Sequence, residues 1–280
     1  MSRTQSLDES LSIASSSDVK AYLQQVLGNT DDLMMVPVRI AGMEGLLCYL
    51  KTMTSSVFMM DNIIKPMSQF TLETDEYLSS AIFEKLREAC FGGLTTQWVE
   101  RLEELTGKLL EGYAGLAVND AEMILSIDVK NLETRSVDEP TTQTVVRGPK
   151  EGFTESAQTN MSLIRRRLFN ERLRFDQYTV GKQTRTNVYV AYIEGNVDLK
   201  VIRRVKARLK QIEVQSLLDS GTLEELLRPR GFSLFPTIYS TERPDKTCAL
   251  LIKNKLAIIV NGSPFVLIVP TVMNEFFSIS

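Results

Sequence analysis

The chain has 280 residues, 43% of them hydrophobic, and a net charge of −3, which suits two medium-sized globular domains and gives no overall attraction to nucleic acid. It contains no histidine, so the commonest general base and transition-metal ligand is missing and a hydrolase is disfavoured. The three cysteines, Cys48, Cys90 and Cys248, form no CxxC pair, which argues against a disulfide framework and a zinc site. We therefore expect a soluble protein of a reducing compartment, with no metal, no other cofactor and no nucleic-acid partner.

The first half of the chain predicts a serine-rich disordered tail, residues 1–17, followed by an α/β lobe, residues 18–140. Apolar spacing and the positions of turn and capping residues define its elements. In chain order we expect a helix over 18–27 capped by Asp18, strands over 32–39 and 45–51, a helix from Ser55 or Ser56 to just before Pro66 with Val57, Met60 and Ile64 on its apolar face, helices over 75–91 and 98–110, and a hairpin of strands 113–118 and 122–127.

The polar segment 130–140 predicts a boundary, and a second lobe follows over residues 141–269. Its expected elements are strands over 141–146, 173–179 and 186–193, a helix over 199–211, a helical turn over 222–227, a helix capped by Thr241 and ending at 252, and two apolar, buried strands over 256–260 and 265–269. Residues 270–280 form a short tail with Phe276 and Phe277. The predicted fold class is α/β with two lobes, each a mixed sheet flanked by helices, similar in outline to solute-binding proteins.

The chain is organised around residues 139–168, here called the central stretch. A glycine- and proline-containing turn over 147–152 leads into a helix, for which Thr154 is the expected N-cap and Glu155 lies in the first turn. An apolar stripe is predicted on that helix, formed by Phe153, Ala157, Met161, Ile164 and Leu168. Three consecutive arginines occupy its last turn, where cations suit the helix dipole.

Two interpretations of the central stretch remain open at this level. A glycine-containing turn before a helix can bind an anion, but the spacing matches neither GxGxxG nor GxxxxGK[ST]. The favoured interpretation is a structural hinge whose charges pair across a domain or subunit contact, because arginine pairs well with carboxylates. A second basic run, residues 200–210, is interpreted as the solvated face of an amphipathic helix.

The sequence closely resembles the A subunits of bacterial spore germinant receptors, the GerA family, over residues 45–270. The blocks that carry the resemblance are EPTTQTVVRGPKEGFTES, Asn160 and LIRRRL in the central stretch, IIKP at 63–66, YIEG at 192–195, LDSG at 218–221, FPT at 235–237, TERPD at 241–245 and GSPFVLIVP at 262–270. The resemblance marks a set of signature residues expected to serve interaction rather than catalysis: Arg147, Gly148, Pro149, Glu151, Gly152, Phe153, Asn160, Arg165, Arg166, Arg167, Glu242, Arg243 and Asp245.

This resemblance implies the N-terminal, core-side domain of a receptor subunit in the inner membrane of the spore, which is not an enzyme. Its implied partners are the B and C subunits, itself, and the membrane through a C-terminal region to which residues 270–280 would lead. The implied function is assembly and signal transduction that triggers spore germination. The alternative is a module that binds a small-molecule germinant or metabolite between the lobes. An enzyme that works through Glu151 and Glu155 is a third, remote hypothesis.

Overall fold

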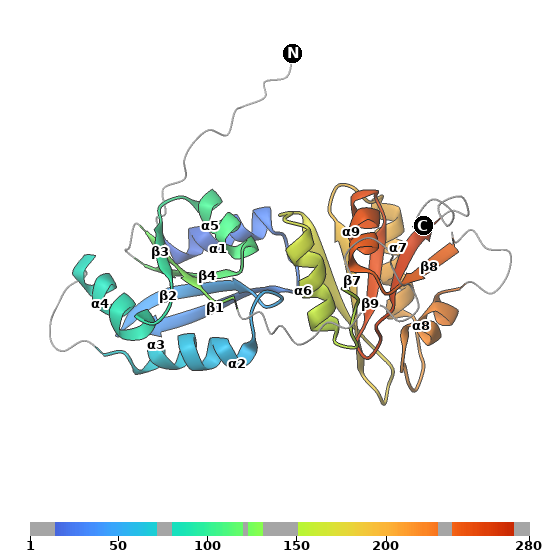
Figure 1. Cartoon of the computed structure of the whole chain (residues 1–280), viewed down its shortest axis with the longest axis horizontal. Coiled ribbons are helices and arrows are strands. Elements are labelled where there is room, and N and C mark those ends of the chain that lie inside the picture. The colour runs from blue at the N-terminus through green and yellow to red at the C-terminus, as the bar shows by residue number, and fades with distance from the viewer. Residues whose placement is uncertain (1–14, 72–79, 120–122, 131–150, 229–236, 272–280) are drawn as a thin grey trace, which may run out of the picture. The chain divides into compact units, whose positions relative to one another are not determined.

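The computed structural model describes residues 15–71, 80–119, 123–130, 151–228 and 237–271. The chain divides into two compact units, here called unit 1 (Met1–Val26 and Leu33–Asn131) and unit 2 (Leu27–Asp32 and Leu132–Ser280). Each unit contains one five-stranded sheet flanked by helices (Figure 1), so the two-lobed α/β fold is confirmed. The lobe boundary that the sequence suggests, at 140–141, lies outside the described residues.

The strand direction within each unit and the boundary of unit 2 both differ from expectation. The described strands of both sheets pair antiparallel, whereas the sequence led us to expect mixed sheets. Four of the eight pairs, such as Leu33–Ile40 with Met43–Leu50, join consecutive strands through short connections, which makes them antiparallel hairpins. The other four pairs join strands that are not consecutive, and no local pattern in the sequence determines their direction. In addition, Leu27–Asp32 belongs to unit 2, although we expected it in the first lobe.

The elements of unit 1 are α1 (Ser16–Val26), β1 (Leu33–Ile40), β2 (Met43–Leu50), α2 (Ser56–Met59), a π-helical turn η1 (Met60–Ile64), α3 (Lys65–Gln69), α4 (Ser80–Phe91), β3 (Thr96–Val99), α5 (Leu102–Leu110), β4 (Tyr113–Val118) and β5 (Ile124–Asp128). The strand order is β1-β2-β4-β5-β3. The central strand β4 is buried at every position, because α1 and α5 pack on one face of the sheet while η1, α3 and α4 cover the other (Figure 1).

The helical segment after β2 corrects one prediction. It does not end before Pro66, since α2, η1 and α3 follow one another without a break to Gln69. The π-helical turn places Pro66 in the first turn of α3, where a missing N–H is tolerated. The apolar face also differs from the predicted one. The buried residues are Met59, Ile63 and Met67. Of the three predicted residues, Val57 and Met60 are exposed, and Ile64 is partly buried against the core.

Two boundaries in unit 1 also differ. The helix expected to begin at Trp98 begins at Leu102, because Trp98 lies in β3 and pairs with Leu125 of β5. Cross-strand pairing stabilises a segment rich in β-branched and aromatic residues more than helix formation does. The first helix begins at Ser16, so Asp18 lies in its first turn rather than at its cap. Ser16 and Ser17, which we expected in the tail, are helical, and residues 1–14 of the predicted tail lie outside the described residues.

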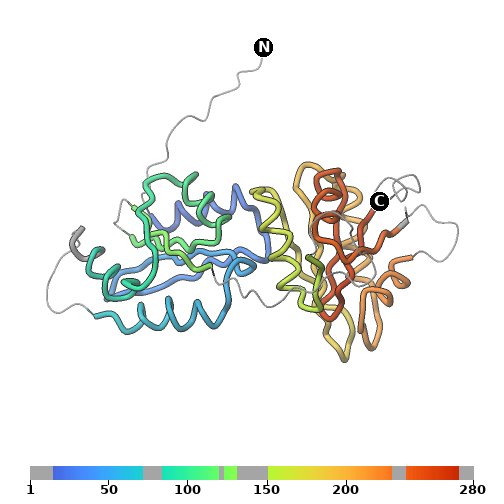
Figure 2. The backbone as a smooth tube through the Cα atoms, in the orientation of Figure 1, coloured from blue at the N-terminus to red at the C-terminus, as the bar shows by residue number. Residues whose placement is uncertain are grey.

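The elements of unit 2 are α6 (Ala157–Arg167), β6 (Leu173–Val180), β7 (Thr186–Ile193), α7 (Leu199–Lys210), α8 (Ser220–Leu227), β8 (Thr237–Thr241), α9 (Pro244–Ile252), β9 (Leu256–Val260) and β10 (Val266–Thr271). The strand order is β6-β7-β9-β10-β8, and the backbone can be followed from yellow α6 to red β10 in Figure 2. The expected helix cap at Thr241 is wrong, because Thr241 ends β8 and Arg243 is the N-cap of α9.

The core of unit 2 consists of two layers, one on each face of its sheet. On one face, α6 and α9 pack against the strands, and on the other face α7 and α8 do so (Figure 1). The predicted apolar strands are confirmed, since every residue of β9 is buried at the centre of the sheet. This three-layer arrangement fixes the position of α6, which carries four of the ten signature residues that the structure describes.

Candidate functional site

The site is built around α6, whose start is fixed by local hydrogen bonds. The N-cap is Ser156, whose hydroxyl accepts a hydrogen bond from the Thr159 backbone N–H at 3.3 Å, so the predicted cap at Thr154 is wrong. Thr154 instead belongs to the preceding loop, where its backbone N–H donates to the side chain of Asn160 at 2.7 Å and its carbonyl accepts from Asn160 at 2.6 Å. Asn160 is fully buried and therefore closes the loop onto the helix.

The first turn of α6 is bonded to the turn that follows β9. The Ala157 N–H donates to the side-chain oxygen of Asn261 at 3.2 Å, and the Gly262 N–H donates to the carbonyl of Glu155 at 2.8 Å. Glu155 precedes the helix and does not lie in its first turn. The amide groups of Ala157 and Thr159 already have protein acceptors, so they are engaged in the fold rather than available to an anion.

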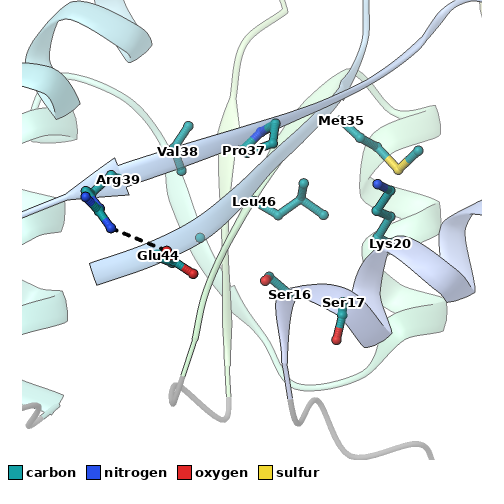
Figure 3. A pocket seen from close by; sticks show the side chains of 10 residues that line it. Ser16, Ser17, Lys20, Met35, Pro37, Val38, Arg39, Glu44 and Leu46 are labelled. Atoms are coloured by element: carbon teal, nitrogen blue, oxygen red, sulfur yellow. Dashed lines mark hydrogen bonds and ion pairs between the residues drawn. The ribbon is translucent and has the colours of Figure 1, made fainter. Parts of the chain in front are cut away.

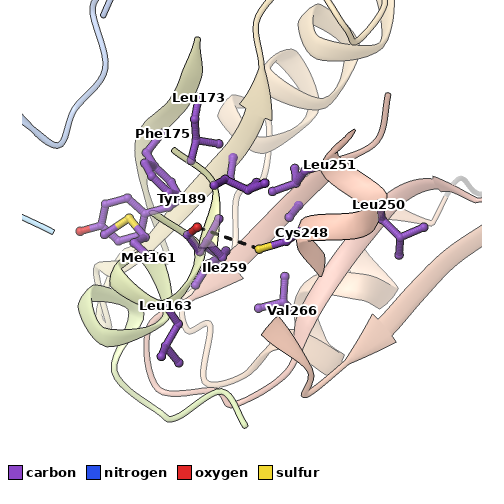
Figure 4. Packing of buried hydrophobic residues seen from close by; sticks show 14 of the residues in the cluster. Met161, Leu163, Leu173, Phe175, Tyr189, Cys248, Leu250, Leu251, Ile259 and Val266 are labelled. Atoms are coloured by element: carbon purple, nitrogen blue, oxygen red, sulfur yellow. Dashed lines mark hydrogen bonds between the residues drawn. The ribbon is translucent and has the colours of Figure 1, made fainter. Parts of the chain in front are cut away.

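The predicted apolar stripe of α6 is confirmed, and it holds the helix in the core. Phe153, Ala157, Met161, Ile164 and Leu168 are all buried. In Figure 4, Met161 lies beside Tyr189 of β7, and the thiol of Cys248 on α9 points to the carbonyl of Ile164, at 4.0 Å. The packing of α6 against β7, β9 and α9 fixes the rotation of the helix, and this rotation decides which way each of its arginines points.

The three arginines in the last turn of α6 separate into two kinds. Arg165 points into unit 2, where its guanidinium binds both carboxylate oxygens of Asp32, and both side chains are 0% exposed. Arg166 and Arg167 are about one-third and one-quarter exposed, and both face Glu151, at 3.9 and 2.5 Å. Adjacent residues of one helix therefore form a fully buried ion pair and a partly exposed ionic group.

A second ionic group lies at the start of α9. The guanidinium of Arg243 binds both carboxylate oxygens of Asp245, at 3.0 and 2.5 Å, and this bond raises the pKa of Arg243. Burial acts to raise the pKa of Asp245, but its bonds and proximity to Arg243 outweigh burial, and the pKa lies below its usual value. The pair therefore remains fully ionised at neutral pH.

The two ionic groups belong to one region of unit 2. The Phe153 N–H donates to the carbonyl of Glu242 at 2.8 Å, which joins the loop before α6 to the residues before α9. Burial raises the pKa of the Cys248 thiol to about 12, while the charge of Arg167 lowers it and that of Asp245 raises it. The helices α6 and α9, which carry Arg167 and Asp245, also pack against each other. We call Glu151, Arg166, Arg167, Arg243 and Asp245 the signature cluster.

The structure brings together most of the signature residues that it describes. Gly152 is buried between Glu151 and Phe153, and Glu242 is buried beside Arg243. Arg147, Gly148 and Pro149 lie outside the described residues. Sequence reasoning missed Asp32 and Asn261, each of which meets the central stretch from more than 100 positions away. The sequence predicts a turn at 261–262, but no local pattern predicts that this turn contacts the start of α6.

Chemically, the signature cluster is an ionic surface of three arginines and two carboxylates. Its charged groups bind one another, and in the described part of the chain no group of three or more cysteine, aspartate or glutamate side chains is placed to hold a metal ion. Such a partly exposed set can exchange its internal pairs for pairs with a carboxylate on another surface.

Unit 1 contains an open groove of about 460 Å³ beside the edge strand β1 (Figure 3). Met35, Pro37 and Leu46 form an apolar floor, and Lys20 reaches over it from α1. At one end, Arg39 pairs with Glu44 at 3.4 Å, with both side chains about 70% exposed. The groove thus combines apolar and charged groups but leaves them open to water.

Comparison with known proteins connects this arrangement to a family. Residues 21–280 match the sequence profile of a family described as Bacillus/Clostridium GerA spore germination protein. The chain is 35% identical to spore germination protein B1 of Bacillus subtilis over 256 residues, which cover 91% of this chain and 52% of that protein. It is 33% identical to spore germination protein KA of the same organism over 260 residues, which cover 92% of this chain and 47% of that protein.

A solved structure is similar over almost the whole chain. The N-terminal domain of the A subunit of the Bacillus megaterium spore germinant receptor GerK3 superposes with a TM-score of 0.71 and 26% sequence identity, covering 95% of this chain and 98% of that one. The chain spans about half the length of the two curated relatives. Within the described residues, we find no helix with the length and apolar character needed to cross a membrane.

Proposed function

Because the chain belongs to the GerA family of spore germination proteins, we propose that it is the N-terminal domain of a germinant receptor A subunit and acts in receptor assembly and signal transduction. The match to the A-subunit N-terminal domain of GerK3, over 95% of this chain, supports this assignment. A non-enzymatic role is part of the proposal, and the names of the relatives support it, since they describe germination proteins.

The observation that carries the proposal is the convergence of separate signature blocks on one partly exposed ionic surface. Residues from the central stretch and from the TERPD block supply the signature cluster, and the backbone hydrogen bond from the Phe153 N–H to the Glu242 carbonyl joins the two blocks. A surface of this kind suits a protein partner that offers a carboxylate, because arginine forms fork-like pairs with that group.

The proposed partners are the B and C subunits of the receptor and further copies of the chain. The proposed location is the inner membrane of the spore, with this domain on the core side and with the membrane reached through a C-terminal region. These points rest on the germination proteins to which the chain is similar.

The test replaces the exposed charges while leaving the core intact. Spores that carry the full-length protein with Arg166→Ala and Arg167→Ala should respond to nutrients more slowly than wild type or not at all, with the protein present at normal amounts. Arg165 is left unchanged, because its buried ion pair would confound the result. The matched control is Lys200→Ala with Arg203→Ala, which removes two exposed cations from α7. Normal germination of the double arginine variant would refute this role for the cluster.

A second candidate function, small-molecule binding, is supported by the groove in unit 1. Its apolar floor and the nearby charges of Lys20, Arg39 and Glu44 suit a small molecule with polar ends. Calorimetry with a panel of germinants and metabolites tests this candidate, which would be rejected if no saturable heat appeared at millimolar concentration. Lys20→Ala serves as the paired variant, since a heat that arises in the groove should decrease when Lys20 is removed.

A further inference from the structure

The strand β6 lies at one edge of the sheet in unit 2. In an antiparallel ladder, the backbone groups of alternate residues face opposite edges. The Glu194 N–H donates to the carbonyl of Arg172 at 2.8 Å, which directs the even-numbered residues of this strand toward β7. The backbone groups of Leu173, Phe175 and Gln177 therefore face the free edge. An uncovered edge of this kind is a template for pairing with another chain.

These groups are bonded to the segment Leu27–Asp32, which we call the clasp. The Asp31 N–H donates to the carbonyl of Phe175 at 2.8 Å, and the Phe175 N–H donates to the hydroxyl of Thr30 at 3.0 Å. The Gln177 N–H donates to the carboxylate of Asp31 at 2.5 Å. The clasp thus occupies the place of a further strand, with side-chain oxygens substituting for backbone acceptors.

One end of the clasp is held by Arg165. Its Nε and Nη2 donate to the carboxylate oxygens of Asp32 at 3.0 to 3.2 Å, and Nη2 also donates to the carbonyl of Leu173, at 3.2 Å. The ring of Phe175 lies 5.1 Å from the guanidinium carbon. A fully buried charge without its partner is strongly unfavourable, so Arg165 and Asp32 require each other.

The other end rests against a second arginine. Gly28 has a φ of +65°, and a Cβ at this position would lie 2.4 Å from Nε of Arg174. Arg174 is itself fixed by the carboxylate of Glu194, at 2.7 and 3.0 Å, and by the carbonyl of Glu171. A side chain at position 28 would therefore collide with a guanidinium that cannot easily move away.

We propose that the clasp is a built-in cover of the β6 edge, held in place by Arg165 and Arg174, and that unit 2 is incomplete without it. The chain on both sides of the clasp belongs to unit 1, so the sheet of unit 2 depends on a segment that interrupts the sequence of unit 1. Arg165, a signature residue, and Glu194, which lies in the YIEG block of the resemblance, thereby act as positioning residues within the molecule. This inference does not depend on the proposed function.

The test uses amide hydrogen exchange of the whole chain, followed residue by residue by NMR. Asp31→Ala is the mild variant, since Asp31 is exposed and the buried pair of Asp32 and Arg165 stays intact. Loss of the acceptor should make the Gln177 amide exchange at least about tenfold faster, equivalent to about 1.4 kcal/mol. Exchange of the Ile258 amide in the central strand β9 should not change.

Asp32→Asn is the stronger variant, because it leaves Arg165 facing a neutral group. Exchange should accelerate at both Phe175 and Gln177, more than at Ile258. The matched control is Asp61→Asn, which removes the same charge from an exposed pair with Lys65 and should leave all three amides unchanged.

Two results would overturn the proposal. The first is an unchanged exchange rate at Gln177 in folded Asp31→Ala, which decides the question even if Asp32→Asn does not fold. The second is an equal acceleration at Gln177 and Ile258, because this pattern indicates general destabilisation of the sheet rather than release of an edge.

Discussion

The carboxamide of Asn160 forms hydrogen bonds with both the backbone nitrogen and the backbone oxygen of Thr154, at 2.7 and 2.6 Å. One fully buried side chain therefore satisfies a donor and an acceptor in the loop that leads into α6. The loop also carries Glu151 and Phe153, which contact Arg167 and Glu242. The shape of the signature cluster thus depends on a residue that is itself inaccessible to a partner.

Asn160→Ala should lower the free energy of unfolding by about 1–3 kcal/mol, because two partly buried backbone groups lose their partners. Chemical denaturation followed by circular dichroism measures this change. The matched control is Asn62→Ala, whose exposed side chain makes one bond to its own helix and should cost less than about 0.5 kcal/mol. Equal effects of the two substitutions would contradict the role assigned to Asn160.

Ile63→Ala should destabilise the protein by about 2–4 kcal/mol, because it leaves a cavity under η1 in the core of unit 1. Val57→Ala, on the neighbouring turn, should change stability by less than about 0.5 kcal/mol, since Val57 is 69% exposed. Thermal and urea unfolding distinguish the two. The opposite order would mean that the face predicted from the sequence is the buried one.

Arg243→Ala should reduce stability most at neutral pH. In the wild type, the pKa of Asp245 lies below its unfolded value, so the ion pair contributes stability above that value and loses it as the pH falls through the folded pKa. Without Arg243, burial of Asp245 raises its pKa. The gap in Tm between wild type and variant should therefore be widest near about pH 7 and narrow below about pH 4.

The exposed pair of Arg39 and Glu44 provides the control for this measurement. The difference in Tm between wild type and Arg39→Ala should not vary with pH. If the difference in Tm between wild type and Arg243→Ala stayed constant from neutral to acidic pH, the ionisation of Asp245 would be excluded as the cause of that difference.

All three cysteine thiols should react slowly in the folded protein. Burial raises the pKa of Cys48 and Cys248 to about 12 and that of Cys90 to about 11, so little reactive thiolate is present at neutral pH. Labelling of the native protein with a thiol reagent should be slow and should modify Cys90 first, because Cys90 is only partly buried. Cys48 and Cys248 should be labelled only after unfolding. Rapid labelling of Cys48 in the native state would show that the face of the sheet next to Gly115 is open.

Much of the fold follows from local patterns in the sequence. The apolar runs of β9 and β10 and the hairpin of β6 and β7 are predicted within a residue or two, because alternation and turn residues act over a few positions. The same holds for the arginines in the last turn of α6 and for the apolar stripe of that helix. The periodicity of apolar residues places their side chains on one face of an element, and that face packs in the core.

Other features were decided by contacts between distant residues. Trp98 lies in a strand because it pairs with β5. Met59 and Ile63 point inward because they pack against the sheet of unit 1. Antiparallel pairing depends in the same way on which strands meet across each sheet.

The three consecutive arginines show this division most clearly. By itself the sequence determined that Arg165, Arg166 and Arg167 end an amphipathic helix, and its blocks resemble a family of germination proteins. Only the tertiary structure decided that Arg165 is buried against Asp32, 133 positions away, while its two neighbours remain partly exposed beside Glu151. Adjacent side chains on a helix point about 100° apart, and the packing of α6 in the core selects which of them meets the interior.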